Sequence, residues 1–127
     1  MSASRIDTIS LVAVPSGDQD RSIEFYVEKL GFEKRTDLPF GNGYRWVEVY
    51  PPTGATGLAL APPPPGSSTG VQTGVILTTD DIDATHAYLS SAGVDVDAEV
   101  ARMGDPVPPM FWFRDPDKNS LLIVQQS

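Results

Sequence analysis

The chain has 127 residues, which is enough for one compact domain and too few for two ordinary ones. Apolar residues make up 40% of it and charged residues 20%, a balance typical of a globular protein rather than a disordered one. Its 17 acidic and 9 basic residues give a net charge of −8, and a surface of that sign repels nucleic acid and anionic lipid. We therefore expect neither nucleic acid nor membrane as a partner.

Two features that the sequence lacks limit the reactions and the location that we expect for the protein. The sequence contains no cysteine, which excludes disulfides, thiolate metal sites and cysteine nucleophiles, and its one histidine is His86. The N-terminal "MSASRIDTIS" lacks the apolar region of a signal peptide, and no stretch approaches the ~20 apolar residues that cross a membrane. We expect a soluble, cytoplasmic protein.

The first half reads as a strand, a helix and three further strands. Residues 9–14 are apolar and largely β-branched, which predicts a strand, and the turn residues "SGDQD" follow with an aspartate to cap a helix. Gly31 suits the end of that helix, and we expect further strands at residues 32–36, 44–50 and 58–61. The apolar face of the helix recurs at i, i+3, i+4 and i+7, in Ile23, Tyr26, Val27 and Leu30.

The second half has the same order of elements after a Pro/Gly/Ser-rich stretch. Residues 62–72 begin with "PPPPGSSTG", whose prolines favour an extended polyproline conformation, so we expect a linker there. Strands are expected at residues 75–77, 110–113 and 120–124, and "DDID" caps a helix that ends at Gly93. Its periodic residues are Thr85, Tyr88, Leu89 and Ala92.

These two halves form an internal repeat. Asp81 and Asp83 follow Asp18 and Asp20 by 63 positions, and the helix residues recur 62 positions later. One strand–helix–three-strand unit cannot cover both faces of its own sheet, so pairing two units gives a physical reason for the duplication.

Three segments resemble the vicinal oxygen chelate superfamily, the glyoxalase/bleomycin resistance/dioxygenase fold. They are "DQDRSIEFYVEKLGFE", "DDIDATHAYLSSAGV" and "RDPDKNSLLIVQ". The resemblance spans residues 5–126 and implies an α+β fold of two βαβββ modules, at 5–61 and 73–126, in a single domain. The curved mixed sheets of such modules enclose a cleft that binds a small molecule, and family members of this length form homodimers in which modules of two chains build the clefts.

Catalytic members of that family hold a divalent metal with His, Gln or Glu side chains. The corresponding positions here are Leu11, Gly74, Leu122 and, on the "LALA" strand, Leu58 or Leu60. None of these side chains has a lone pair that could bind such an ion. The resemblance therefore implies a member without a metal or other cofactor, like the bleomycin-resistance proteins that sequester their ligands.

Strand alternation indicates which other residues face the cleft. In "YRWVEVY", Trp46, Glu48 and Tyr50 share one face, and we expect Val47 and Val49 to pack under the helices instead. In "MFWF", Met110 and Trp112 are expected to face the cleft, while Phe111 and Phe113 pack under the helices. The predicted ligand-binding residues are Leu11, Trp46, Glu48, Leu58, Gly74, Met110, Trp112 and Leu122.

Smaller features have structural interpretations. We interpret His86 as a surface or helix-flank residue, and the aspartates of "DDID" and "DPD" as capping and turn residues. Lys118 stands where the family prefers glycine, and Asn119 could adopt the left-handed conformation in its place.

Three functions remain open at this point. The first is metal-independent binding of a small, largely apolar or aromatic molecule, with Glu48 as the single fixed charge of the pocket. The second is a lyase, isomerase or dioxygenase with a non-standard site in which Glu48 is the candidate general base. The third is an interaction module whose cleft is filled by its own side chains. The sequence does not decide whether the protein is an enzyme.

Overall fold

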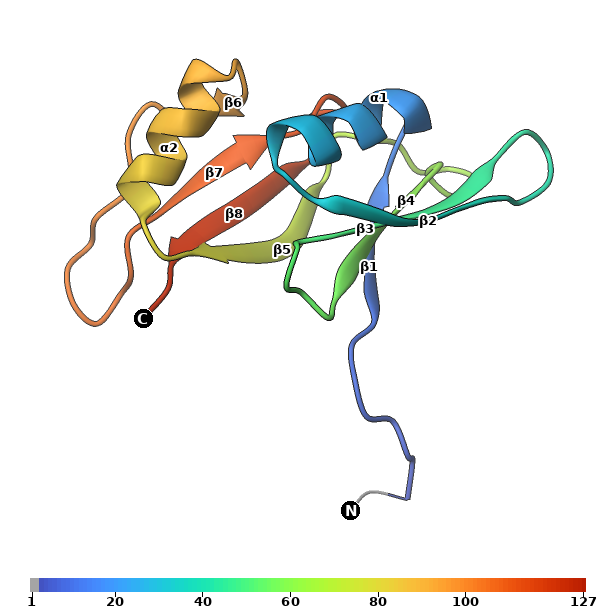
Figure 1. The fold of residues 1–127 in the computed structure, drawn as a ribbon, viewed down its shortest axis with the longest axis horizontal. Coiled ribbons are helices and arrows are strands. Elements are labelled where there is room, and N and C mark those ends of the chain that lie inside the picture. Colours follow the sequence, from blue (N-terminus) through green and yellow to red (C-terminus); the bar gives the residue numbers. More distant parts are fainter. Residues whose placement is uncertain (1–2) are drawn as a thin grey trace.

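A computed structural model describes residues 3–127 and contains two four-stranded sheets (Figure 1). The first sheet has the strand order β1-β4-β3-β2 and the second β5-β8-β7-β6. The strands of the first sheet are β1 (Leu11–Pro15), β2 (Glu33–Pro39), β3 (Arg45–Tyr50) and β4 (Gly57–Ala61). Those of the second are β5 (Gln72–Thr79), β6 (Asp95–Val96), β7 (Met110–Arg114) and β8 (Ser120–Gln125).

The two sheets have the same mixed topology. In each, the first strand pairs in parallel with the fourth, and the remaining pairs are antiparallel. The parallel pairing follows from the helix that connects the first strand to the second, since that helix carries the chain back across the sheet. The α+β class and the two βαβββ units predicted from the sequence are confirmed.

One helix covers each sheet, and both lie on the same side of the strands in Figure 1. The first is α1 (Gln19–Glu24), which continues as a π-helical segment, η1 (Phe25–Lys29); the second is α2 (Ile82–Ser91). The predicted aspartate caps are present: Asp18 accepts a hydrogen bond from the Arg21 amide at 3.1 Å, and Asp81 accepts one from the Ala84 amide at 3.0 Å. The internal repeat therefore includes the aspartate hydrogen bonds that cap the two helices.

Several local predictions need correction. The first strand begins at Leu11 and not at Ile9, and the side chain of Ile9 is exposed. On α2, Tyr88 is also exposed, and the buried residues of that helix are Ile82 and Leu89. Lys118 itself adopts the left-handed conformation, at φ 68°, so Asn119 does not take it over.

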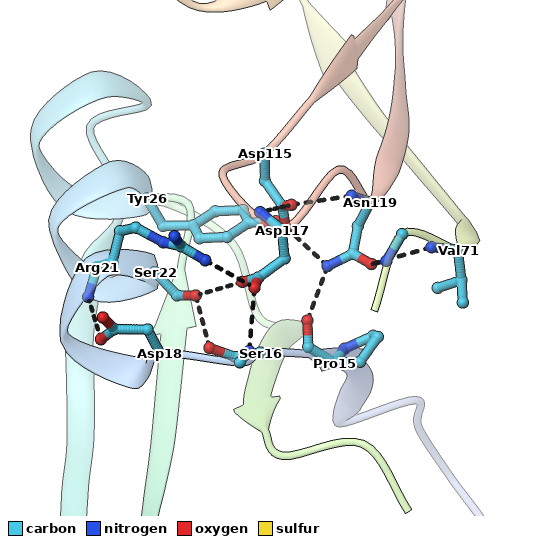
Figure 2. A network of polar contacts seen from close by, with 12 residues as sticks. Pro15, Ser16, Asp18, Arg21, Ser22, Tyr26, Val71, Asp115, Asp117 and Asn119 are labelled. Atoms are coloured by element: carbon cyan, nitrogen blue, oxygen red, sulfur yellow. Dashed lines mark hydrogen bonds and ion pairs between the residues drawn. The ribbon is translucent and has the colours of Figure 1, made fainter. Parts of the chain in front are cut away.

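The turn between β7 and β8 joins the two halves of the chain (Figure 2). Asn119 is fully buried; its side-chain amide donates to the Pro15 carbonyl at 2.7 Å and its carbonyl accepts from the Gly70 and Val71 amides at 2.9 and 3.1 Å. The same side chain donates to Asp115 at 3.0 Å. One amide thus connects the end of β1, the end of the inter-sheet linker and the second sheet.

Two buried aspartates extend this turn network to the first helix. The Tyr26 hydroxyl donates to Asp115 at 2.8 Å, and both Arg21 and Ser22 donate to Asp117. Burial, and after it the Asp115 carboxylate, raises the pKa of Tyr26, so its hydroxyl stays protonated and remains a donor. The aspartates are turn residues, as predicted, and they also fasten α1 to the second sheet.

Apolar side chains also pack between the two halves of the chain. Phe25 stacks on Phe113 with 6.3 Å between ring centroids, and both belong to one hydrophobic cluster that contains residues of both sheets. Among residues 3–127, no helix has both the length and the apolar character that a membrane span requires.

Candidate ligand-binding faces

Each sheet has a helix-covered face and an opposite face, which we call its open face. On the first sheet, Glu48 pairs with Ala59 and Thr36, whereas Val49 pairs with Leu58. Directly paired residues point to the same side, so these two sets lie on opposite faces. Val47 and Val49 are buried in the core, and Trp46, Glu48 and Tyr50 therefore lie on the open face, as the alternation predicted.

Glu48 is held by its neighbours on the same strand. The Trp46 indole Nε1 donates to its Oε2 at 2.7 Å, and the Tyr50 hydroxyl donates to its Oε1 at 2.8 Å. The bond from Trp46, followed by those from Tyr50 and Thr36, holds the pKa of the Glu48 carboxyl below its usual value. Glu48 is therefore a charged acceptor at neutral pH and a weak base.

An apolar extension lies next to this carboxylate. Leu38 pairs with Trp46 across the β2–β3 hairpin, and the Phe40 ring lies 5.8 Å from the Trp46 ring, centroid to centroid. Leu38 is 58% exposed and Phe40 65%. Neither residue was among those predicted, although continuing the alternation of Trp46 across the "GNG" turn would have found them. The hairpin that carries them projects from the rest of the molecule in Figure 1.

The open face of the second sheet is apolar at its centre. Trp112 pairs with Leu122, which pairs with Ile76 on its other side, and Met110 pairs with Val124. Phe111 and Phe113 are fully buried on the helix-covered face. The predicted orientation of Met110 and Trp112 is thus confirmed, and Ile76, which is 61% exposed, is an addition to the predicted set.

The remaining predicted site residues divide between the two faces. Leu11 lies on the open face, because Leu11 and Ala13 pair with Gly57 and Ala59 in the same register as Glu48. Leu58 does not: it is 4% exposed and belongs to the core cluster on the helix-covered side of its sheet. The sequence "LALA" alternates without a polar residue, and only the register with β3 shows that Ala59 faces outward. Gly74 is exposed at an irregular point of β5.

These positions do not fit a metal centre. The positions that the resemblance gives for metal ligands are Leu11, Gly74, Leu122 and Leu58 or Leu60, and none of them has a coordinating side chain; nor does Ala59, the residue of that strand on the open face. Within residues 3–127, no group of three or more His, Asp or Glu side chains is placed to hold a metal ion. No step through a metal is derived for this chain.

His86 has a structural place on the flank of α2. Its Nε2 lies 2.7 Å from the Asp97 carbonyl oxygen, and its ring meets the Phe111 ring edge-on with 4.8 Å between centroids. The residue is half-buried and remote from Glu48 in the sheet order, since β3 and α2 belong to different halves. This agrees with the helix-flank interpretation.

A separate groove of about 990 Å³ lies between the two halves. We call it the inter-sheet groove; its lining comes from β1, the loop before β4, β5 and α2, and includes Ile9, Val12, Leu58, Ile76, Tyr88 and Leu89. Trp46, Glu48, Met110 and Trp112 are not part of it. It is bordered by β1 and β5, which are the edge strands of their sheets.

Comparisons with known proteins agree on one family. The family model for the Glyoxalase/Bleomycin resistance protein/Dioxygenase superfamily matches residues 8–123. A Bacillus subtilis (strain 168) relative, "Uncharacterized protein YetH", is 30% identical over 126 residues, covering 94% of this chain and 99% of its own.

Solved structures are similar over almost the whole chain. TnmS3, an antibiotic binding protein from Streptomyces sp. CB03234, is 36% identical with a TM-score of 0.84, covering 97% of this chain and 98% of its own. A superfamily member from Sphaerobacter thermophilus DSM 20745 is 32% identical with a TM-score of 0.88, covering 95% of this chain and 98% of its own.

Proposed function

The chain belongs to the glyoxalase/bleomycin resistance protein/dioxygenase superfamily, and we propose that within it the protein binds a small, largely apolar or aromatic molecule without a metal ion. The observation that carries this proposal is the composition of the open faces. The open face of the first sheet carries Trp46 beside the Glu48 carboxylate, that of the second carries Met110, Trp112 and Leu122, and no coordinating side chain stands at the predicted metal positions. An apolar surface with few fixed polar groups is typical of small-molecule sites.

Similarity to TnmS3 supports binding over other roles. That protein is described as antibiotic binding, and it matches this chain along nearly its full length at 36% identity. A role in sequestering an aromatic metabolite or antibiotic is consistent with both the fold and the open faces. The general-base alternative is disfavoured, because a carboxyl with a lowered pKa is a weaker base at neutral pH.

We also propose that two chains combine to complete each cleft. Trp46 and Glu48 of the first open face and Met110 and Trp112 of the second do not line the inter-sheet groove, and both β1 and β5 have an unpaired edge. Unpaired edges and exposed apolar side chains favour association with another chain. A symmetric homodimer that sets the first sheet of one chain against the second sheet of its partner would enclose two equivalent clefts. The cytoplasmic location expected from the sequence stays a prediction.

Native mass spectrometry of the protein purified from its native host tests the binding proposal. We expect a co-purified organic molecule at one per chain, and elemental analysis of the same sample should find less than stoichiometric metal. The matched variants are Trp112→Ala, which removes an open-face ring, and Ser90→Ala, which truncates an exposed side chain on α2 outside the open faces and the groove. Stoichiometric zinc, nickel, manganese or iron, or equal ligand loss in both variants, would contradict the proposal.

A further inference from the structure

The open faces carry one charge that nothing in the described chain neutralises. Within residues 3–127, strand pairing and side-chain contacts place Glu48 and two ion-paired sets of side chains on or beside these faces. Glu33 is paired with Arg35 at 3.1 Å, and Arg114 is paired with Asp95 and Asp97 at 2.9 and 2.8 Å. Glu48 has no ion-pair partner among these residues, and its hydrogen-bond partners are the neutral side chains of Trp46, Tyr50 and Thr36.

The Glu48 carboxylate can accept a further hydrogen bond. A carboxylate offers about four lone-pair positions on its two oxygens. Trp46 uses one position on Oε2, Tyr50 uses one on Oε1 and Thr36 supplies a third hydrogen bond, so the carboxylate keeps capacity for one further donor. Because both neighbours also restrain the side chain, a ligand that binds it loses little further side-chain freedom.

The rings that hold Glu48 also favour a positive charge beside it. The face of an aromatic ring attracts cations, most strongly for tryptophan. The chain already uses one of these rings in this way, since the Arg35 guanidinium lies 4.4 Å from the centroid of the Tyr50 ring. The Trp46 ring has Phe40 at its side and the residue is 36% exposed, and the centre of the second open face is apolar.

We infer that the ligand carries a positively charged nitrogen, an amine, amidine or guanidinium, attached to an aromatic or apolar body. In this arrangement Glu48 accepts the N–H bond, Trp46 and Tyr50 flank the charge, and the apolar residues of the second sheet contact the body of the ligand. This inference rests on the proposed function, because it assigns the chemical class of the molecule bound by the same faces. An anionic ligand is disfavoured by Glu48 and by the net charge of −8.

A series of three acridines of nearly the same shape tests the role of charge. At pH 7.5, 9-aminoacridine is a cation, acridine is neutral and acridine-9-carboxylate is an anion. Calorimetric titration of the full chain should show the cation binding about tenfold or more tightly than the neutral compound, the difference expected from one charge-assisted hydrogen bond. The carboxylate should bind most weakly.

The variant Glu48→Gln should abolish the preference for the cation while keeping the affinity for neutral acridine. It is nearly isosteric: its one carbonyl oxygen can accept from the Trp46 indole, and its amide N–H can donate to the Tyr50 hydroxyl. The fold should therefore be retained, which a melting curve checks. Glu28→Gln is the matched control: it removes one charge from an exposed position on η1, and it should leave the preference intact.

Two results would overturn the inference. If the cation and the neutral acridine bound the wild type equally, or if Glu28→Gln reduced the preference as much as Glu48→Gln, recognition of a cation by Glu48 would be wrong while small-molecule binding could stand. Failure of all three acridines to bind at millimolar concentration would also overturn it. The proposed function is judged separately, by the co-purified ligand and the metal content.

Discussion

At the scale of single residues, Glu48 offers the most direct access to the chemistry of the open faces. Its two oxygens accept hydrogen bonds from two different side chains, and each of these has a phenylalanine variant that lacks the donor group. The contribution of each bond to the ionisation of the carboxyl can therefore be measured separately. This matters because a general base and a charged anchor need opposite shifts of that pKa.

Removing the indole donor should raise the pKa of Glu48. The bond from Trp46 is the largest cause of the lowered value, so Trp46→Phe should move the Glu48 pKa upward toward that of an ordinary glutamate. Tyr50→Phe should raise it by a smaller amount. Carboxyl ¹³C chemical shifts followed through a pH titration give both values. An unchanged pKa in Trp46→Phe would contradict the hydrogen bond on which the site is built.

The pH dependence of binding follows from the same shift. A cation is attracted only by the ionised carboxylate, which is the form present above the pKa of Glu48. Because that pKa is lowered, affinity for 9-aminoacridine should stay constant from neutral pH down through the usual glutamate range and fall only below it. A fall in affinity beginning near pH 6 would mean that a different group is titrating, or that Glu48 has a raised pKa.

Residue-level prediction succeeded where a strand mixes polar and apolar side chains. In "YRWVEVY" the valines alternate with larger or polar residues, and their burial was predicted correctly. In "LALA" both alternating sets are apolar, so nothing in the sequence distinguishes Leu58 from Ala59. The register with β3 decides the matter, and register depends on pairing with residues distant in the chain.

At the scale of elements, the β7–β8 turn is the main connection between the halves. Asn119→Ala would leave the Pro15 carbonyl and the Gly70 and Val71 amides without their partner in a buried place. We expect the free energy of unfolding to fall by about 3 kcal/mol, since buried groups left unpaired cost about 1–3 kcal/mol each and water can reach some of them. Urea denaturation measures this loss.

Lys118→Gly provides the matched control in the same turn. Lys118 adopts φ 68°, which glycine takes at no steric cost, so this substitution should leave stability unchanged or raise it by about 1 kcal/mol. If Lys118→Gly destabilised the protein as much as Asn119→Ala, the turn would be sensitive to any change, and the specific role of the Asn119 amide would be wrong.

Element boundaries were predicted less well than element types. The helix face of Ile23, Tyr26, Val27 and Leu30 was found from its periodicity, but the π-helical segment Phe25–Lys29 was not. Such a segment inserts one residue into the helical turn, and the sequence carries no periodic mark of it. Here it accompanies the packing of Phe25 on Phe113 and of Tyr26 against Asp115, both of which are contacts with the second sheet.

At the scale of the whole molecule, the internal repeat was the sequence feature that predicted the architecture best. Two aspartate caps 63 positions apart, two terminal glycines with positive φ and two sheets of the same topology all follow from one duplicated unit. What the repeat could not indicate is how the halves sit together. That arrangement depends on the Asn119 and Asp117 contacts, which have no counterpart in the repeated segments.

The inter-sheet groove predicts where a second chain binds. Tyr88 is exposed on α2 and lines this groove, beside the free edges of β1 and β5. If a partner covers the groove, Tyr88→Glu would bury an unpaired charge and raise the dimer dissociation constant by about tenfold or more. Sedimentation velocity across a concentration range measures this constant.

Ser90→Glu is the control for that substitution. Ser90 lies two residues further along α2, is exposed and does not line the groove, so the same added charge should leave the dimer intact. A wild-type protein that sediments as a monomer at every concentration would contradict the dimer, and equal weakening by both variants would place the interface elsewhere.

The central claim is that the open faces, and not a metal centre or the inter-sheet groove, hold the ligand. A crystal structure of the protein with its co-purified molecule, or with 9-aminoacridine, tests this most directly. We expect electron density between Trp46 of one chain and Trp112 of its partner, with a ligand nitrogen within hydrogen-bonding distance of a Glu48 oxygen and no metal ion nearby. Density confined to the inter-sheet groove, or a metal ion coordinated in the cleft, would contradict it.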